Sequence, residues 1–136
     1  MPPVAVMGVC VEGFEAGVLR LRAPLSRHVN DKGCAFGGSL VSLMTLAAWG
    51  VVTLRLELAG IDADVFVADS EVAYRAPLYD DLVVEARLSE ELDWDGFLAC
   101  LRERGRAGIH LAAGIRLPGG GAAAEMQARY VAVAKG

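Results

Sequence analysis

The sequence has few of the residues that build metal centres and disulfide frameworks. Its 136 residues include two histidines and three cysteines, an odd number that contains no CxxC pair. This pattern predicts neither a metal site nor a disulfide scaffold. Cys10 and Cys100 are expected to be small core residues on strands, whereas Cys34 falls in a glycine-rich loop. We therefore expect no metal and no bound redox cofactor.

Positive charge and nucleotide-binding motifs are scarce as well. Thirteen Lys and Arg residues face 17 Asp and Glu residues, a net charge of −4, so a basic surface for nucleic acid is not expected. The sequence contains neither GxxxxGK[ST] nor a GxGxxG fingerprint after a strand, which argues against nucleotide hydrolysis. No basic stretch leads into an apolar one at the N-terminus, so we expect a cytoplasmic protein.

Apolar residues, in contrast, are abundant. They make up 54% of the chain and concentrate in one stretch, residues 38–58, which predicts the only long helix. A stretch of this length could cross a membrane. Serine and threonine residues interrupt it and strand patterns flank it, so we expect instead a helix buried in a single domain, residues 1–136, without membrane contact. The apolar excess also favours a homodimer or a dimer of dimers.

Alternating apolar and polar residues predict several strands around this helix. The expected strands are residues 17–25, 63–77, 82–90, 97–105, 108–118 and 124–134. Residues 4–13 fit either a short edge strand or part of a helix. Consecutive strands joined by short turns favour antiparallel pairing. The predicted fold class is α+β, with one long central helix wrapped by a curved antiparallel sheet of five to six strands.

The stretch NDKGCAFGGSL, residues 30–40, leads directly into the helix. The first N–H groups of a helix lack internal partners and carry partial positive charge, so they attract a negative oxygen. Gly37 and Gly38 would let a ligand approach this backbone, and Gly38 or Ser39 could serve as the N-cap. Alternatively, the glycines only make a tight turn, which Asn30 and Asp31 would cap through their side chains.

The chain resembles the hot-dog fold thioesterases, and more narrowly the YiiD C-terminal family of thioesterase domains. The resemblance covers nearly the whole chain and rests on APL at 23–25, NDKGCAFGGSL at 30–40, AAWG at 47–50 and YRAP at 74–77. The family pattern GTAF is GCAF here, with Cys34 in place of threonine. The resemblance implies hydrolysis of an acyl-CoA or acyl-carrier-protein thioester, with coenzyme A present only as part of the substrate.

The resemblance also implies roles for individual positions. Related enzymes of the phenylacetate type place an asparagine seven residues before the second residue of an HGG turn, and Asn30 stands seven residues before Gly37. By this resemblance the amides of Gly37 and Gly38 polarise the thioester carbonyl, and Asn30 positions a reactant. Those enzymes carry an acidic residue eight positions further on, where this chain has Thr45, which is no general base at neutral pH.

Two aspartates are candidates for activating water instead. Asp69 interrupts an apolar strand face begun by Val65 and Val67, and Asp31 adjoins the glycine turn. A carboxylate can take a proton near neutral pH if burial raises its pKa. Asp69 is the preferred base, reaching the site of a neighbouring subunit. The alternative for Asp69 is an ion pair with Arg75, and the alternative for Asp31 is a turn residue.

Further side chains are predicted to bind the substrate. The candidates of the loop and the helix are Cys34, Phe36, Ser39 and Thr45, and those of the later charged run are Arg102, Arg104 and Arg106. Arginines on the outside of hot-dog proteins meet the phosphates of coenzyme A, which suits the guanidinium fork. The alternative is a solvated turn. Trp49 and Trp94 are expected to be packing residues.

Two other functions remain open from the sequence. A non-catalytic acyl-CoA-binding or assembly module would keep the fold without a base, which the threonine at position 45 favours. An enoyl-CoA hydratase of this fold would use a histidine with a carboxylate. His28 lies just before the glycine-rich loop, but the dehydratase motif is absent around it, and His110 is expected to face solvent or cover the sheet.

Overall fold

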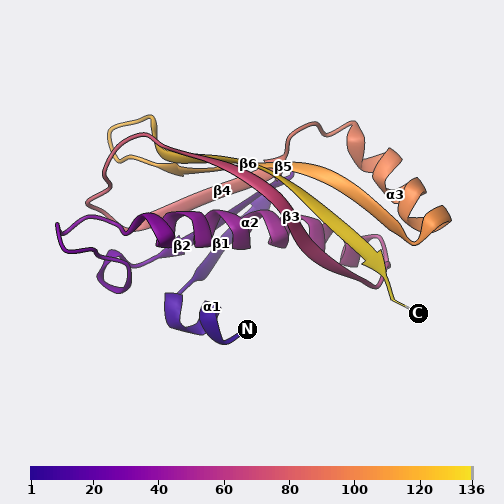
Figure 1. The fold of residues 1–136 in the computed structure, drawn as a ribbon, viewed down its shortest axis with the longest axis horizontal. Coiled ribbons are helices and arrows are strands. Elements are labelled where there is room, and N and C mark those ends of the chain that lie inside the picture. The colour runs from indigo at the N-terminus through magenta and orange to yellow at the C-terminus, as the bar shows by residue number, and fades with distance from the viewer. Residues whose placement is uncertain (136) are drawn as a thin grey trace.

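One long helix and one curved sheet make up most of the molecule (Figure 1). The computed structural model describes residues 1–135. The elements are α1 (Pro2–Met7), β1 (Cys10–Glu15), β2 (Val18–Ala23), η1 (Leu25–Arg27), α2 (Gly37–Leu58), β3 (Ala63–Tyr74), β4 (Leu82–Leu88), α3 (Asp93–Arg104), β5 (Arg106–Arg116) and β6 (Ala122–Ala134). All neighbouring strands are antiparallel, in the order β1-β2-β4-β5-β6-β3. The expected α+β fold is confirmed.

The two faces of the sheet follow from the alternation along each strand. In β4, the side chains of Leu82, Val84, Ala86 and Leu88 are buried, whereas Arg87 between them is exposed. The buried positions of β5 and β6 alternate in the same way and pair across the sheet. One face is therefore apolar and concave, and the other carries the charged side chains.

α2 fills the concave face of the sheet. Its buried residues recur every three or four positions along one side: Leu40, Leu43, Met44, Ala47, Ala48, Val51, Val52 and Leu56. This stripe packs against the five strands β2 to β6. The helix comes so close to β2 that a Cβ atom at Gly50 would lie 2.6 Å from Cδ2 of Leu19. A side chain at position 50 would force the buried Leu19 to shift, which accounts for the glycine that ends the AAWG stretch.

α2 is the only helix within residues 1–135 that is long and apolar enough to cross a membrane. The mean hydropathy of its most apolar window is 1.6, and 44% of that window is buried. The buried side belongs to the core formed with the sheet. Packing against the sheet thus explains the apolar stripe of this helix.

The prediction of a strand over residues 97–105 is wrong, because this segment belongs to helix α3. Trp94, Phe97 and Leu101 are buried at a spacing of three and four residues, which is the helical period. Gly105, with a φ of 72°, ends the helix in the left-handed conformation. Cys100 consequently lies half-buried on a helix and not in the core of a strand.

The N-terminal segment combines both structures that its sequence allowed. α1 ends at Gly8, whose φ of 64° is left-handed, and β1 begins two residues later. β1 is an edge strand, so Cys10 at its start is exposed. The expectation that Cys10 is a core residue is therefore wrong, since an edge strand at this end of the sheet has no partner layer over it.

A bulge in β3 changes the direction of Asp69. Val67 pairs with Tyr130 of β6, but Asp69 pairs with Arg129, the residue before it in β6, so the register shifts at Ala68. Because opposite residues of paired strands point to the same face, Val67 lies on the concave face with buried Tyr130, and Asp69 lies on the convex face. The prediction that Asp69 continues the face of Val65 and Val67 is wrong.

Charged side chains tie three strands together on the convex face. Glu85 of β4 accepts a hydrogen bond of 2.6 Å from Arg20 of β2, and its other oxygen lies 2.6 Å from a guanidinium nitrogen of Arg116 of β5. The hydrogen bond from Arg20, and after it that from Arg116, lowers the pKa of Glu85 against the opposing effect of burial. The carboxylate is therefore stabilised in its charged form.

Replacing Glu85 by Gln removes this charge and keeps the shape of the side chain. We expect Glu85→Gln to lower the midpoint of urea unfolding at pH 7. A lowered folded-state pKa contributes stability above the ordinary value of about 4.3, and this contribution is lost as the pH falls through the folded-state pKa. The midpoints of wild type and variant should therefore converge as the pH falls below the folded-state pKa of Glu85. A difference that stays constant with pH would contradict this role, and Glu103→Gln, at an exposed position of α3, is the control.

Candidate active site

The loop before α2 is held in shape by Asn30. Its Oδ1 accepts hydrogen bonds from the backbone N–H groups of Lys32, at 2.8 Å, and Cys34, at 3.2 Å. Its Nδ2 donates to the sulfur of Cys34, and Val29 pairs with Ala35 across the loop. Asn30 thus performs the turn-capping role that its sequence also allowed. Roles of Asn30 in catalysis and of Cys34 in substrate binding remain predictions.

α2 begins at Gly37 with a free N-terminus. Its N-cap is Phe36, whose side chain makes no capping hydrogen bond, so the expected cap at Gly38 or Ser39 is wrong. The carbonyl of Phe36 accepts the N–H groups of Ser39 and Leu40. Within residues 1–135, the N–H groups of Gly37 and Gly38 have no hydrogen-bond acceptor. Two donors at the positive end of a 22-residue helix are thus available to a ligand.

Aromatic side chains border these two amides. A Cβ atom at Gly37 would lie 3.4 Å from the ring of Tyr74, and one at Gly38 would lie 2.5 Å from the ring of Phe36. Both rings are more than half exposed. A side chain at position 38 would therefore push the exposed ring of Phe36 away from the helix start. The rings frame the amides without contributing an acceptor to them.

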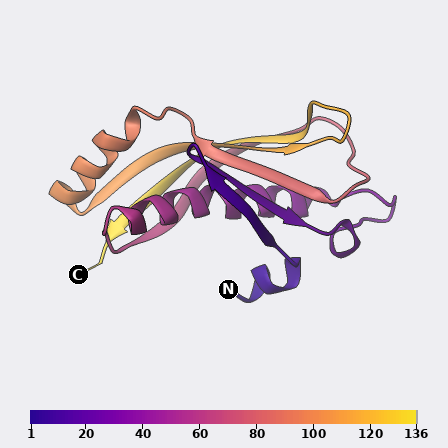
Figure 2. The same ribbon diagram turned by 180° about the vertical axis from the view of Figure 1, so that it is seen from behind.

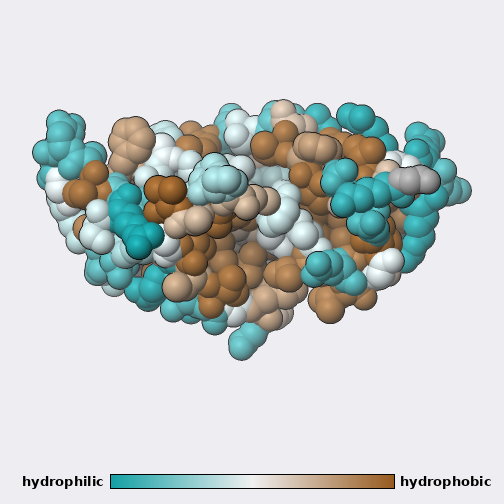
Figure 3. All heavy atoms as spheres, turned by 90° about the horizontal axis from the view of Figure 1, so that it is seen from below, coloured by the Kyte–Doolittle hydropathy of each residue, from teal (hydrophilic) through white to brown (hydrophobic). Residues whose placement is uncertain are grey.

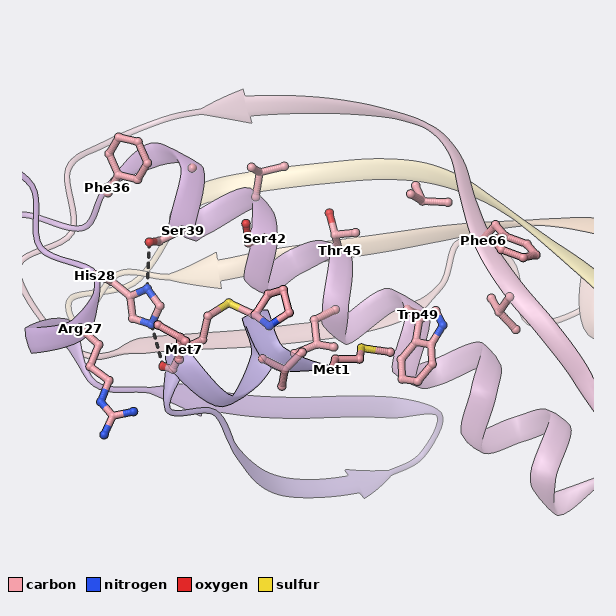
Figure 4. A pocket seen from close by; sticks show the side chains of 18 of the residues that line it. Met1, Met7, Arg27, His28, Phe36, Ser39, Ser42, Thr45, Trp49 and Phe66 are labelled. Carbon is pink, nitrogen blue, oxygen red and sulfur yellow. Dashed lines mark hydrogen bonds between the residues drawn. The ribbon is translucent and has the colours of Figure 1, made fainter.

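A cleft of about 870 Å³ opens beside the helix start, between α2, α1 and β3. Figure 4 shows Ser39, Ser42, Thr45 and Trp49 following one another along the side of α2 that lines it. Much of the remaining lining is apolar and comes from α1 and from β3. Figure 3 shows apolar residues gathered over the middle of the face seen from below. The cleft therefore suits an apolar chain whose polar end lies at Gly38.

Thr45 lies in the middle of this cleft, at the position that is acidic in the related enzymes. Its carbonyl accepts a hydrogen bond of 2.7 Å from the hydroxyl of Tyr130, which also lines the cleft. Burial raises the pKa of Tyr130 far above its ordinary value, so the phenol stays a neutral donor. No aspartate or glutamate is among the described residues that line the cleft.

The two predicted bases lie outside this cleft in a single chain. The side chain of Asp31 is 83% exposed and its carboxylate lies 3.3 Å from Nζ of Lys32. Asp69 is paired with Arg129 at 3.2 Å on the convex face, while the alternative partner, Arg75, is bound to Glu125. Asp69 could act only in a neighbouring subunit, and catalysis by either aspartate remains a prediction.

The predicted arginine patch lies at the far end of the molecule. Arg102 and Arg104 are exposed in the last turn of α3, and Arg106 begins β5. Figures 1 and 2 show α3 at the opposite end of the sheet from the loop before α2. The guanidinium of Arg55, near the end of α2, stacks 4.6 Å from the ring centre of Trp94. At 1.5 Å per residue, the start of α2 is roughly 27 Å from Arg55.

His28 is the site residue whose environment the sequence did not reveal. It is only 5% exposed, and among residues 1–135 it is the only polar or charged residue that is buried. Its ring contacts Ser39 Oγ and the carbonyl of Met7, each at 2.8 Å, and no carboxylate (Figure 4). The histidine–carboxylate pair of a hydratase is therefore absent here. His110 is exposed on β5, as expected.

Side chains that could hold a metal do not converge in the described part of the chain. Between residues 1 and 135, no three His, Cys, Asp or Glu residues are grouped closely enough to bind one. The site therefore offers backbone amides, hydroxyl groups and one imidazole. These groups bind and polarise a carbonyl and move protons.

Comparison with known proteins agrees with this arrangement. A family model described as "Putative thioesterase (yiiD_Cterm)" matches residues 1–134. A solved structure of a protein of unknown function from Chlorobaculum tepidum is 27% identical, with a TM-score of 0.93 over 99% of this chain and 88% of that chain. A second solved structure, from Shewanella oneidensis, is described as a putative thioesterase. It is 28% identical, with a TM-score of 0.83 over 98% of this chain and 88% of that chain.

More distant thioesterases share the fold alone. One from Haemophilus influenzae is 15% identical, with a TM-score of 0.76 over 97% of this chain and 82% of that chain. The match of the family model over nearly the whole length agrees with the central helix and the wrapped antiparallel sheet. The chain therefore belongs to the YiiD C-terminal family of thioesterase domains and has the hot-dog fold.

Proposed function

We propose that this protein hydrolyses acyl thioesters of coenzyme A or of an acyl carrier protein at the start of α2. The observation that carries the proposal is the pair of N–H groups at Gly37 and Gly38, which lack acceptors within residues 1–135. Gly38 lines an apolar cleft, and Gly37 precedes it in the first turn of α2. Attack on a thioester carbonyl creates an oxyanion. Fixed donors at a helix N-terminus stabilise such a charge more than the uncharged carbonyl, and this difference accelerates the reaction.

The cleft along α2 gives the acyl chain its place. Val41 and Leu46 of α2 and Val65 of β3 line it together with Trp49. Burying a methylene group in such surroundings contributes about 0.8 kcal/mol. The substrate we propose therefore carries an aliphatic or aromatic acyl group, with its carrier extending past Phe36 toward solvent. Phe36 is 57% exposed and offers a surface for this part of the substrate.

The working unit that we propose is a homodimer, or a dimer of such dimers, joined along β3. β3 is an edge strand, and its outer backbone groups have no partner strand within residues 1–135. Phe66 and Val67 on it are 56% and 46% exposed, which is costly for large apolar side chains beside an open sheet edge. Pairing of two β3 strands would cover these side chains and close the cleft, which opens next to them.

A non-catalytic acyl-binding module remains a second candidate. The absence of a carboxylate among the described residues of the cleft, with Thr45 at the position that is acidic in related enzymes, favours it. Such a protein would bind an acyl thioester with the same amides and the same apolar cleft. It would not release a thiol, so turnover separates the two functions.

Gly37→Pro tests the oxyanion site with little disturbance of the helix. Proline is well accepted at the first helical position, where Gly37 stands, and the preceding Phe36 already has the extended ψ of 133° that proline demands. The substitution removes one N–H donor. We expect kcat/KM for acyl-CoA esters, measured by thiol release, to fall about 10²–10³-fold.

Gly37→Ala is the matched control for this substitution. It adds the same Cβ atom near Tyr74 but keeps the N–H group, so its activity should stay close to that of wild type. Equal rates for the proline and alanine variants would remove the Gly37 amide from the chemistry. Tight binding of acyl-CoA by wild type without any thiol release, across short, long and aromatic acyl groups, would instead support the acyl-binding module.

Phe66→Glu tests the proposed dimer. A charge at the exposed edge of β3 would be buried without a partner in a dimer, so we expect this variant to sediment as a monomer of 14.3 kDa. Wild type should sediment at twice that mass, or at four times that mass if two dimers associate. Leu92→Glu changes a more exposed apolar residue, 89% exposed, before α3 and should remain dimeric. Sedimentation velocity measures both, and a wild-type monomer would contradict the proposed assembly.

A further inference from the structure

Ser39 and His28 form a pair of side chains that the oxyanion site leaves unused. Ser39 Oγ and His28 Nδ1 are 2.8 Å apart, and both residues line the cleft. Ser39 is the third residue of α2, directly after the two glycines with free amides. Gly38, Ser39 and His28 thus lie together at the polar end of the apolar cleft, and Figure 4 shows the hydroxyl of Ser39 facing the imidazole of His28.

The contacts of His28 fix which ring nitrogen carries the proton. Nε2 lies 2.8 Å from the carbonyl oxygen of Met7, which can only accept, so Nε2 must be protonated. In the neutral imidazole Nδ1 then has a free lone pair. The hydroxyl of Ser39 therefore donates its hydrogen bond to Nδ1. This is the arrangement of a nucleophile beside its general base, with the base oriented by a third group.

A purely structural reason for this pair is weak. Ser39 does not cap α2, because its own N–H donates to the carbonyl of Phe36 and its hydroxyl points to His28. His28 is only 5% exposed and lies in a wall of the cleft that is otherwise largely apolar. Burying a polar ring has a free-energy cost, and a hydrophobic residue at position 28 would fill the same space without it.

We infer that Ser39 is the nucleophile and His28 its general base in the thioester hydrolysis proposed above, on which this inference rests. The proton of Ser39 Oγ moves to His28 Nδ1 as Oγ bonds to the thioester carbon. The oxyanion forms at the amides of Gly37 and Gly38. It collapses by breaking the C–S bond, and the thiolate leaves with the proton from Nδ1. The acyl group is then an ester of Ser39.

Water completes the cycle by the same route. His28 Nδ1 takes a proton from water, the hydroxide attacks the ester carbon, and the oxyanion again forms at the two amides. The C–O bond to Ser39 breaks, and Oγ regains the proton from Nδ1, which releases the carboxylic acid. The neutral carbonyl of Met7 stabilises the imidazolium less than a carboxylate would, so a slow turnover is expected.

Intact-protein mass spectrometry tests the inference directly. Wild type mixed with an acyl-CoA ester and quenched in acid should gain the mass of one acyl group, which peptide mapping places on Ser39. Ser39→Ala should show no adduct and lose kcat/KM by on the order of 10³-fold or more. Ser39→Cys should still take up the acyl group, now as a thioester. His28→Gln should slow acylation about 10²–10⁴-fold.

Matched controls separate this chemistry from simple misfolding. Ser26→Ala and His110→Gln change exposed residues outside the cleft and should leave acylation and turnover unchanged. The circular dichroism of each variant should match wild type. An acyl group on Ser39→Cys is a result that a structural role of Ser39 would not produce.

The outcomes distinguish this inference from the proposed function. Full turnover by Ser39→Ala, without an adduct on wild type, would overturn the nucleophile and leave the thioesterase standing. An acyl group on Ser39 that water never removes would support the nucleophile and contradict the proposed turnover. Wild type that neither forms an adduct nor releases thiol would overturn both.

Discussion

The proposed site depends on how α2 is held in the fold. The apolar side of the helix is anchored in the core, whereas its N-terminal end has no side-chain cap. The buried stripe of α2 packs against five strands, with Gly50 allowing close contact to Leu19, so the helix cannot shift to satisfy its first amides. The loop before it is closed by the hydrogen bonds of Asn30 and supplies Phe36 as a cap without a side-chain acceptor. Core packing thus keeps the N–H groups of Gly37 and Gly38 available, and the proposed chemistry follows from that availability.

The polar groups of the cleft explain why the mechanism of the related enzymes, in which a carboxylate activates water, does not apply unchanged to this chain. A single bulge in β3 turns Asp69 to the convex face, and Asp31 extends from the loop into solvent beside Lys32. What remains at the polar end of the cleft are hydroxyl groups and the buried imidazole of His28. A helix start that binds an oxyanion does not by itself activate a nucleophile. The pairing of Ser39 with His28 supplies this second requirement from residues that are already in contact.

The fold could be predicted from the sequence where periodicity was simple. The long apolar run gave α2 within one residue of its start, and the alternating segments gave β2 to β6. The prediction of a strand over residues 97–105 was wrong because their charges resemble those of an exposed strand. The helical spacing of this segment becomes evident only when Trp94 is included. The direction of Asp69 was not predictable, because a bulge depends on pairing with β6 and leaves no pattern in one strand. The burial of His28 likewise depends on α1, whose Met7 carbonyl is brought to it by the turn at Gly8.

Nuclear magnetic resonance of the glycine amides can show whether the start of α2 binds the thioester carbonyl. In the proposed mechanism the N–H groups of Gly37 and Gly38 bind the thioester carbonyl. A ketone analogue of acyl-CoA, in which CH₂ replaces sulfur, should therefore bind in the same place without being hydrolysed. We expect both amide protons to move downfield on binding, as hydrogen bonds to the ketone oxygen form, while the indole signal of Trp49 reports that the cleft is filled. A shifted indole signal with unchanged amide signals of Gly37 and Gly38 would show that the ligand fills the cleft without binding to the start of α2.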